Sequence, residues 1–125
     1  YGPTEITCNC TYYVIDREFK PGEVLPMGRP FPNEKVFLLD ESNQLVDQRT
    51  VGIRGEVCVS GTALALGYYN NAQQTNKAFV QNPLNHQYLE TIYRTGDLAE
   101  YNRYGELCFV SRKDFQIKHM GHRIE

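Results

Sequence analysis

The feature that most constrains the fold is a succession of short apolar runs, each followed by turn residues. The runs are rich in Val, Ile, Thr and Tyr, which favour strands. They cover residues 6–15, 36–40, 57–59, 91–93, 98–101 and 106–110. With the alternating residues 115–119 they give about seven strands or more, which predicts a mainly β chain arranged as a barrel or a sandwich.

One helix interrupts this pattern. Asn70 or Asn71 can cap a helix that runs through Phe79, and the Asn82–Pro83 pair ends it. Its small apolar face is predicted to comprise Ala72, Thr75, Ala78 and Phe79.

Turns are predicted at three further places. Residues 1–5 form a turn because Gly2-Pro3 disfavours a helix. Gly96 and Asp97 form a turn after the strand at 91–93, and residues 98–110 form a hairpin that turns near Gly105. Residues 45–46 are expected to pair back as a short strand.

Composition excludes several classes of function. The chain has 125 residues, of which 41% are hydrophobic and 22% charged, so one packed domain is expected. A net charge of -2 gives no basic surface for a nucleic acid or an anionic membrane. No apolar run approaches the roughly 20 residues that cross a bilayer. We therefore expect neither a nucleic-acid nor a membrane partner.

The four cysteines do not form a metal-binding pattern. Cys8 and Cys10 are expected on one face of a strand, but no second close pair completes a zinc site. Buried free thiols are typical of a reducing compartment, which predicts a cytoplasmic location.

Two pairs of adjacent residues could take part in binding or catalysis. Asp97, directly after Gly96, can accept hydrogen bonds from two vicinal hydroxyls, as on a ribose. Thr4 can donate to a phosphate, and the adjacent Glu5 suits a hard cation such as Mg²⁺. Taken alone, each pair is more typical of a solvated turn. Their neighbours along the chain favour the functional interpretation.

Four stretches together resemble the adenylate-forming (AMP-binding) superfamily. They are YGPTE at residues 1–5, GEVCVSG at 55–61 with the following Gly67-Tyr68, YRTGDL at 93–98 and RKDFQIK at 112–118. The similarity covers essentially the whole chain. The first and last stretches look most like amino-acid-activating members, namely the adenylation domains of nonribosomal peptide synthetases and D-alanine:carrier-protein ligases.

The resemblance implies a fold and a boundary. Residues 1–113 would be the distorted β-barrel subdomain, with one short helix, of an adenylation domain. Residues 114–125 would be the hinge and the first strand of a small α+β C-terminal domain. The ends carry no initiator Met, lead-in element or cap, so we expect a fragment of a longer protein. The family's phosphate loop and most of its acyl pocket are missing from the chain, so the fragment alone is expected to be inactive.

The resemblance also implies a nucleotide site. Tyr1 would stack on adenine, as its flat ring allows. Thr4 would contact the α-phosphate and take part in catalysis. Asp97 would accept from both ribose hydroxyls, Arg112 would lie near the ribose, and Phe109 would help to line the nucleotide side.

The other implied roles concern the metal, the acid and the domain motion. Glu5 would be catalytic and hold Mg²⁺. Cys8 and Asn9 would line the pocket for the acyl or aminoacyl group. Asp114 would be the hinge, and Lys118 would approach the active site only in the second conformational state.

The implied function is activation of an amino acid, or another small carboxylic acid, with ATP and Mg²⁺. The aminoacyl-adenylate would then pass its acyl group to the phosphopantetheine thiol of a carrier protein. Two alternatives stay open at the level of sequence: an acyl-CoA synthetase that uses CoA as acceptor, and a non-catalytic β-barrel interaction module.

Overall fold

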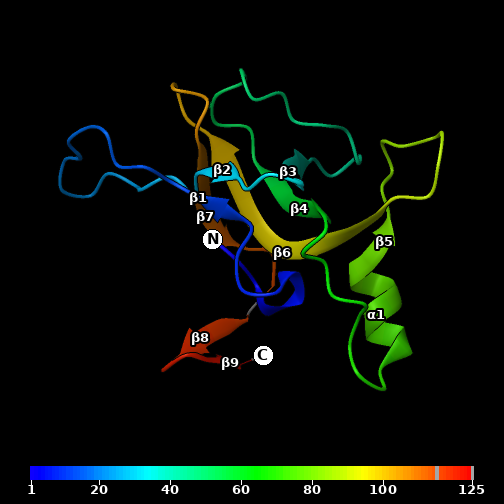
Figure 1. Cartoon of the computed structure of the whole chain (residues 1–125). Coiled ribbons are helices and arrows are strands. Elements are labelled where there is room, and N and C mark those ends of the chain that lie inside the picture. The colour runs from blue at the N-terminus through cyan, green and yellow to red at the C-terminus, as the bar shows by residue number, and fades with distance from the viewer. Residues whose placement is uncertain (115, 125) are drawn as a thin grey trace.

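A long strand, β6 (Thr91–Tyr101), organises the fold. The computed structural model describes residues 1–114 and 116–124, without the side chains at positions 117 and 118. In this part of the chain β6 belongs to a five-stranded antiparallel sheet (Figure 1). The other members are β3 (Glu34–Leu39), β4 (Gly55–Gly61), β5 (Phe79–Gln81) and β7 (Leu107–Arg112).

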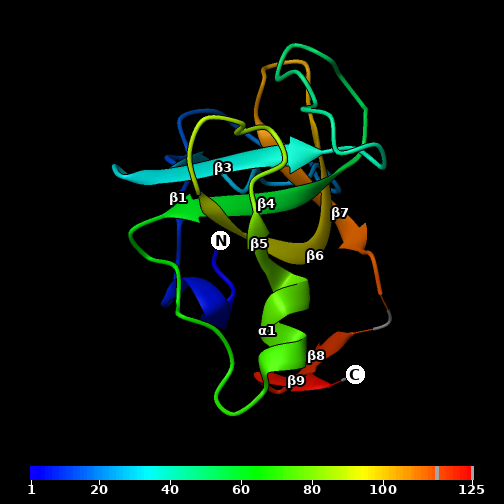
Figure 2. The same ribbon diagram turned by 90° about the vertical axis from the view of Figure 1, so that its right-hand side faces the viewer.

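The pairing of β6 explains why the sheet curls into a half-barrel. One edge of β6 pairs with β4, and β3 continues the sheet beyond β4. The other edge pairs with β5 near Tyr93 and with β7 from Asp97 onward. Along this edge β6 therefore pairs with β5 near its start and with β7 toward its end, and it crosses the molecule between them (Figures 1 and 2).

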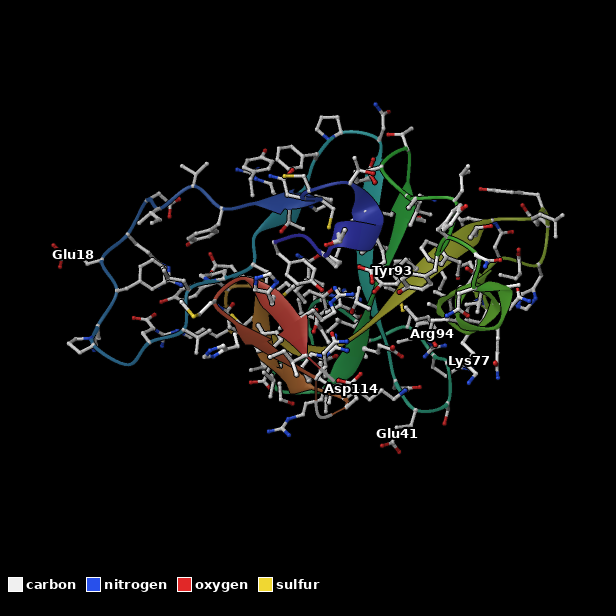
Figure 3. All side chains as sticks on the ribbon, turned by 90° about the horizontal axis from the view of Figure 1, so that it is seen from below. Glu18, Glu41, Lys77, Tyr93, Arg94 and Asp114 are labelled. Atoms are coloured by element: carbon white, nitrogen blue, oxygen red, sulfur yellow. The ribbon has the colours of Figure 1, made fainter. Side chains whose placement is uncertain are left out.

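Two smaller sheets and one helix complete the described part of the chain. Strand β1 (Thr11–Tyr12) pairs with β2 (Arg29–Pro30), and β8 (Ile117–His119) pairs with β9 (His122–Ile124). The β8–β9 hairpin lies below the main sheet in both ribbon views. The loop between β1 and β2 projects away from the sheet, with Glu18 near its outer end in Figure 3.

The core lies against both faces of the central strands. Every residue of β4 except its last is buried, as expected for a strand covered on two sides. The larger cluster includes Ile6, Leu38, Val57 and Val59, all with no exposed surface. A smaller cluster on the opposite face contains Leu39, Cys58 and Ile92. Burying each large aliphatic side chain contributes roughly 1.5–3 kcal/mol before entropy is subtracted.

The mainly β fold, the helix and the hairpin were all predicted correctly. Helix α1 spans Ala72–Ala78, and the Asn71 side chain caps it by accepting from the Gln74 amide at 3.0 Å. In the hairpin, β6 and β7 pair from Tyr101 opposite Leu107 to Asp97 opposite Arg112, with a shift of register between Ala99 and Leu98.

The strand predicted at residues 6–15 is wrong. A 3-10 turn, η1, spans Thr4–Ile6, and Thr7 and Cys8 then adopt positive φ angles of 55° and 87°. The chain folds back so closely that a Cβ on Gly2 would lie 2.2 Å from the Asn9 Cα. Within residues 6–15, strand β1 spans only Thr11–Tyr12. Cys8 and Cys10 therefore do not share a strand face: Cys8 is exposed and Cys10 is buried.

Two other details differ from the sequence predictions. Gly96 and Asp97 do not form a turn, because β6 continues through them. The predicted strand at 45–46 is reduced to one bridge between Leu39 and Leu45. No described helix is long and apolar enough to cross a membrane. The boundary at 113/114 stays a prediction, and Phe115, in the predicted hinge strand, lies outside the described residues.

Candidate functional site

A cavity of about 430 Å³ opens where the N-terminal segment meets the middle of β6 and the end of β7. It brings together four residues that the sequence assigned to the nucleotide. The lining residues are Tyr1, Gly2, Pro3, Asp97, Phe109, Arg112, Gln116 and Arg123. The four predicted ones, Tyr1, Asp97, Phe109 and Arg112, come from three separate segments of the chain, so the fold rather than local sequence assembles this site.

A bulge in β6 presents Asp97 to the cavity. Cys58 pairs with Arg94 and Glu56 pairs with Leu98, so Val57 alone lies opposite residues 95–97. Gly96 provides the left-handed conformation that the extra residues need, with φ of 73°.

Thr95 ties this bulge to β4. Its Oγ1 donates to the Val57 carbonyl at 2.8 Å and accepts from the Asp97 amide at 3.0 Å. What the sequence suggested to be a turn is therefore a bulge in mid-strand, closed by a buried threonine hydroxyl.

Asp97 is 8% exposed, and both of its carboxylate oxygens have partners. The Tyr1 hydroxyl donates to Oδ2, and Arg112 Nη1 donates to Oδ1 at 2.8 Å. Burial, and after it the negative charge of Asp97, raise the pKa of the Tyr1 hydroxyl. Tyr1 is therefore a neutral donor at physiological pH, and its ring is held at the edge of the cavity.

Arg112 connects this carboxylate to the predicted hinge residue. Its Nε and Nη2 donate to the two oxygens of Asp114 at 3.0 and 2.7 Å, and Nη1 also donates to the Thr95 carbonyl at 2.6 Å. Burial opposes the charge on Arg112, but the hydrogen bonds with Asp114 and Asp97 outweigh it and raise its pKa. Pairing with Arg112 lowers the pKa of Asp114.

Glu5 forms a second buried ionic group beside the cavity. Its side chain is 4% exposed, and the Tyr68 hydroxyl donates to Oε1 at 2.8 Å. Arg123, on β9, donates to both oxygens, with Nη2 3.1 Å from Oε2. Burial opposes ionisation of Glu5, but the hydrogen bonds from Arg123 and Tyr68 outweigh it and lower its pKa to about 2.

The donor chemistry of Glu5 fits Mg²⁺. It is an ionised carboxylate, and Mg²⁺ in nucleotide sites commonly takes one or two protein carboxylates and completes its shell with phosphates and water. Within residues 1–114 and 116–124, no group of three His, Cys, Asp or Glu side chains forms a self-sufficient metal cage. A metal on Glu5 would take the place that the Arg123 guanidinium holds.

Other predicted site residues lie outside this cavity. Thr4 is exposed, next to the buried Glu5. Cys8 and Asn9 are exposed on the bend after η1 and do not line the cavity. Phe109, by contrast, does line the cavity, and 43% of its surface is exposed. Lys118 belongs to β8, and its side chain lies outside the described residues.

Four residues of the site had no role predicted for them from the sequence, namely Arg123, Thr95, Glu56 and Tyr68. Arg123 looked like one polar residue in a short C-terminal stretch, and its partner is 118 positions away. Thr95 and Glu56 act through the bulge, which periodicity could not reveal. Tyr68 belongs to a motif that was recognised, but its hydroxyl contact with Glu5 depends on the fold.

Comparison with known proteins identifies the family. The profile of the AMP-binding enzyme family matches residues 1–69. Tyrocidine synthase 3 of Brevibacillus parabrevis is 39% identical over 125 residues, which are 100% of this chain and 2% of that protein. Surfactin synthase subunit 2 of Bacillus subtilis (strain 168) is 42% identical over the same length, 3% of that protein.

Solved structures agree with this assignment. Holo-PA1221, described as a nonribosomal peptide synthetase protein containing adenylation and PCP domains bound to a vinylsulfonamide inhibitor, superposes with a TM-score of 0.87. It is 37% identical and covers 99% of this chain, which spans 21% of it. IdnL1 gives a TM-score of 0.89 at 32% identity, covering 100% of this chain and 25% of its own.

The chain thus spans only a small part of each relative named above. Within that part the likeness is continuous, and it includes the segments that form the cavity. The chain belongs to the AMP-binding enzyme family.

Proposed function

We propose that the protein carrying this segment activates an amino acid with ATP. It forms an aminoacyl-adenylate and pyrophosphate, and then transfers the aminoacyl group to the phosphopantetheine thiol of a carrier protein. One observation carries the proposal most directly: Tyr1, Asp97, Phe109 and Arg112 meet at one cavity. The relatives named above as peptide synthases, and a solved relative that contains adenylation and PCP domains, support the choice of an amino acid and a carrier protein.

Asp97 and Arg112 hold the ribose in this proposal. Each carboxylate oxygen of Asp97 has a second lone pair in addition to the one that its present partner uses. Two vicinal hydroxyls can therefore donate to Asp97 while Tyr1 and Arg112 keep it in place. The fixed charge and planar fork of Arg112 stabilise the carboxylate in that orientation.

Tyr1 and Phe109 flank the base. Both rings line the cavity, and an aromatic face is a suitable surface for a purine. The high pKa of Tyr1 keeps its hydroxyl neutral, so the ring carries no charge that would oppose the phosphates.

Thr4 and Glu5 serve the α-phosphate and the metal. The Thr4 hydroxyl donates to a phosphate oxygen, and the Glu5 carboxylate binds Mg²⁺. When bound, Mg²⁺ offsets the negative charge of the phosphates. The low pKa of Glu5 keeps this carboxylate ionised throughout the physiological range.

The remaining predicted residues concern the acid and the second half-reaction. Cys8 and Asn9 face the acyl pocket, whose other walls belong to parts of the parent protein beyond this chain. Asp114 is the hinge between residues 1–113 and 114–125. Rotation about it brings Lys118 to the active site for thioester formation.

The test is ATP–pyrophosphate exchange by the full-length protein across a panel of amino acids. We expect exchange with at least one of them, and a loss of about tenfold or more in Asp97→Ala, since hydrogen bonds to a charged group contribute roughly 1.5–3 kcal/mol. Asp47→Ala, an exposed carboxylate on a distant loop, is the matched control and should exchange normally. The proposal fails if no acid supports exchange, or if Asp97→Ala matches the control.

A second assay separates the two acceptors. The loaded enzyme is offered a holo carrier protein or free CoA, and the thioester product is measured. Transfer to the carrier protein is expected. Efficient transfer to CoA alone would make the protein an acyl-CoA synthetase.

A further inference from the structure

Glu56 is a buried carboxylate next to the bulge that carries Asp97. It is 6% exposed and sits on β4, opposite Leu98. Its Oε2 accepts from Arg94 Nη2 and Nε at 2.7 and 3.0 Å. Its Oε1 accepts from the backbone N–H of Gly96 at 3.1 Å. One carboxylate therefore binds a side chain of β6 and the backbone of the bulge itself.

Both backbone polar groups of Gly96 are hydrogen-bonded. Glu56 holds its N–H, and the N–H of Lys113 donates to its carbonyl at 2.7 Å. Lys113 also reaches Glu56 through its side chain, with Nζ 3.4 Å from Oε2. Figure 3 shows Arg94 and Asp114, which belong to the two segments that Glu56 joins, in the view from below.

An arginine–glutamate pair that only joined two strands would not need the contact with Gly96. The register shift falls between Glu56 and Cys58, where the ladder cannot satisfy the Gly96 N–H. An amide buried without a partner costs about 1–3 kcal/mol, and the partly buried Gly96 N–H would bear a share of that cost, so an acceptor at this position stabilises the bulge. Glu56 provides that acceptor without lining the nucleotide cavity.

We propose that Glu56 is the positioning residue for Asp97: it sets the bulge so that the Asp97 carboxylate meets both hydroxyls of a ribose. The proposal rests on the function proposed above. Glu56 acts through the Gly96 peptide and does not touch the nucleotide. Its loss should therefore change how well the site distinguishes a ribose from a deoxyribose more than it changes binding of the base.

The experiment compares binding of AMP and 2′-deoxy-AMP to the full-length protein by calorimetry. In the wild type we expect AMP to bind about tenfold or more tightly than 2′-deoxy-AMP, as one charged hydrogen bond allows. In Glu56→Ala this preference should fall to about twofold or less, because affinity for AMP, which makes both hydroxyl contacts, should fall more than affinity for 2′-deoxy-AMP, which makes only the 3′-hydroxyl contact.

Two variants separate positioning from general stability. Arg94→Met removes the ion pair but leaves Glu56 free to hold Gly96, so the ribose preference should remain. Glu34→Ala removes another carboxylate that accepts a backbone N–H, that of Ala63 at 3.0 Å, and it should also keep the preference. If Arg94→Met loses the preference as fully as Glu56→Ala, Glu56 acts only as an ion-pair partner and the proposal is wrong.

Amide exchange supplies a readout that does not depend on nucleotide. Residue-resolved hydrogen–deuterium exchange should show Gly96 protected in the wild type and fast in Glu56→Ala, while Tyr93 in the paired part of β6 stays protected. If Glu56→Ala does not fold, the shorter Glu56→Asp takes its place with the same expectations. Unprotected Gly96 in the wild type would overturn the proposal.

Failure of the two proposals can be told apart. A wild type that binds neither nucleotide refutes the proposed function, and the positioning role falls with it. A wild type that prefers AMP, with a Glu56→Ala variant that keeps the preference, refutes the positioning role alone.

Discussion

The Tyr1 hydroxyl donates a hydrogen bond to the Asp97 carboxylate across 96 positions of sequence. This contact closes the proposed nucleotide cavity at the N-terminal segment and fixes one oxygen of Asp97. It also makes two roles of Tyr1 separable, because the ring can line the cavity without the hydroxyl.

Tyr1→Phe should therefore destabilise the fold while leaving an aromatic wall for the base. The partly buried hydrogen bond to a charged acceptor is expected to contribute about 1–2 kcal/mol to the free energy of unfolding. Urea denaturation measures this, with Tyr69→Phe, at a fully exposed position, as the control. Equal stabilities for the two variants would contradict the expectation.

The Glu5–Arg123 pair should make the free energy of unfolding depend on pH. The folded-state pKa of Glu5 is about 2 against an ordinary value of 4.5, so the stabilisation is complete above pH 4.5 and is lost as the pH falls toward 2. Because the Arg123 side chain is 33% exposed, we expect about 2 kcal/mol rather than the full linkage value.

Unfolding free energies of wild type and Glu5→Gln, measured from neutral pH down to about pH 2, check this. The gap between the two proteins should be largest at neutral pH and should close in acid. A gap that is constant with pH would mean that Glu5 is not ionised in the fold.

Gly96→Ala tests how tightly the bulge is packed. A Cβ there would lie 2.6 Å from Arg112 Nη2, and φ is already positive at 73°. Gly22→Ala is a matched control, with a similar φ of 83° and nothing within 4 Å of the added Cβ. Both variants bear the cost of the left-handed backbone, about 1 kcal/mol. Gly96→Ala alone should lose more stability and should weaken AMP binding, as thermal melts and calorimetry would show.

The 125-residue chain by itself should bind ATP weakly and catalyse no pyrophosphate exchange. Its cavity contains the groups that we propose for the base and the ribose, and we propose that other parts of the full-length protein supply most of the acyl pocket. Calorimetry with ATP should reveal no micromolar binding. Micromolar affinity would show that the chain contains more of the site than the base and ribose contacts.

The sequence predicted the fold where local rules decide the structure. Asn71 caps α1 because a side-chain acceptor at that position satisfies a free helical amide, whatever the rest of the fold. The hairpin after β6 followed equally from turn residues between apolar runs. The prediction failed at residues 6–15, where β propensity was overridden by the packing of Gly2 against Asn9.

For the site, the resemblance supplied the residues and the structure supplied their connections. Asp97 and Arg112 were singled out by motif, yet no pattern indicated that the guanidinium also binds Asp114. Arg123 was missed because its contact with Glu5 joins residues far apart in the sequence and produces no periodic pattern. Glu56 stood in a recognised motif without a role, since its contact with Gly96 depends on an offset in strand register.

The double contact of Arg112 has a practical consequence for protein engineering. The predicted boundary at 113/114 is an obvious place to join an adenylation subdomain to a foreign C-terminal domain. Such a junction passes between Arg112 and Asp114, which bind each other through two hydrogen bonds. A chimera that keeps the arginine but loses a compatible carboxylate would disturb the guanidinium that also holds Asp97. Recombination at this point should therefore transfer both residues as one unit.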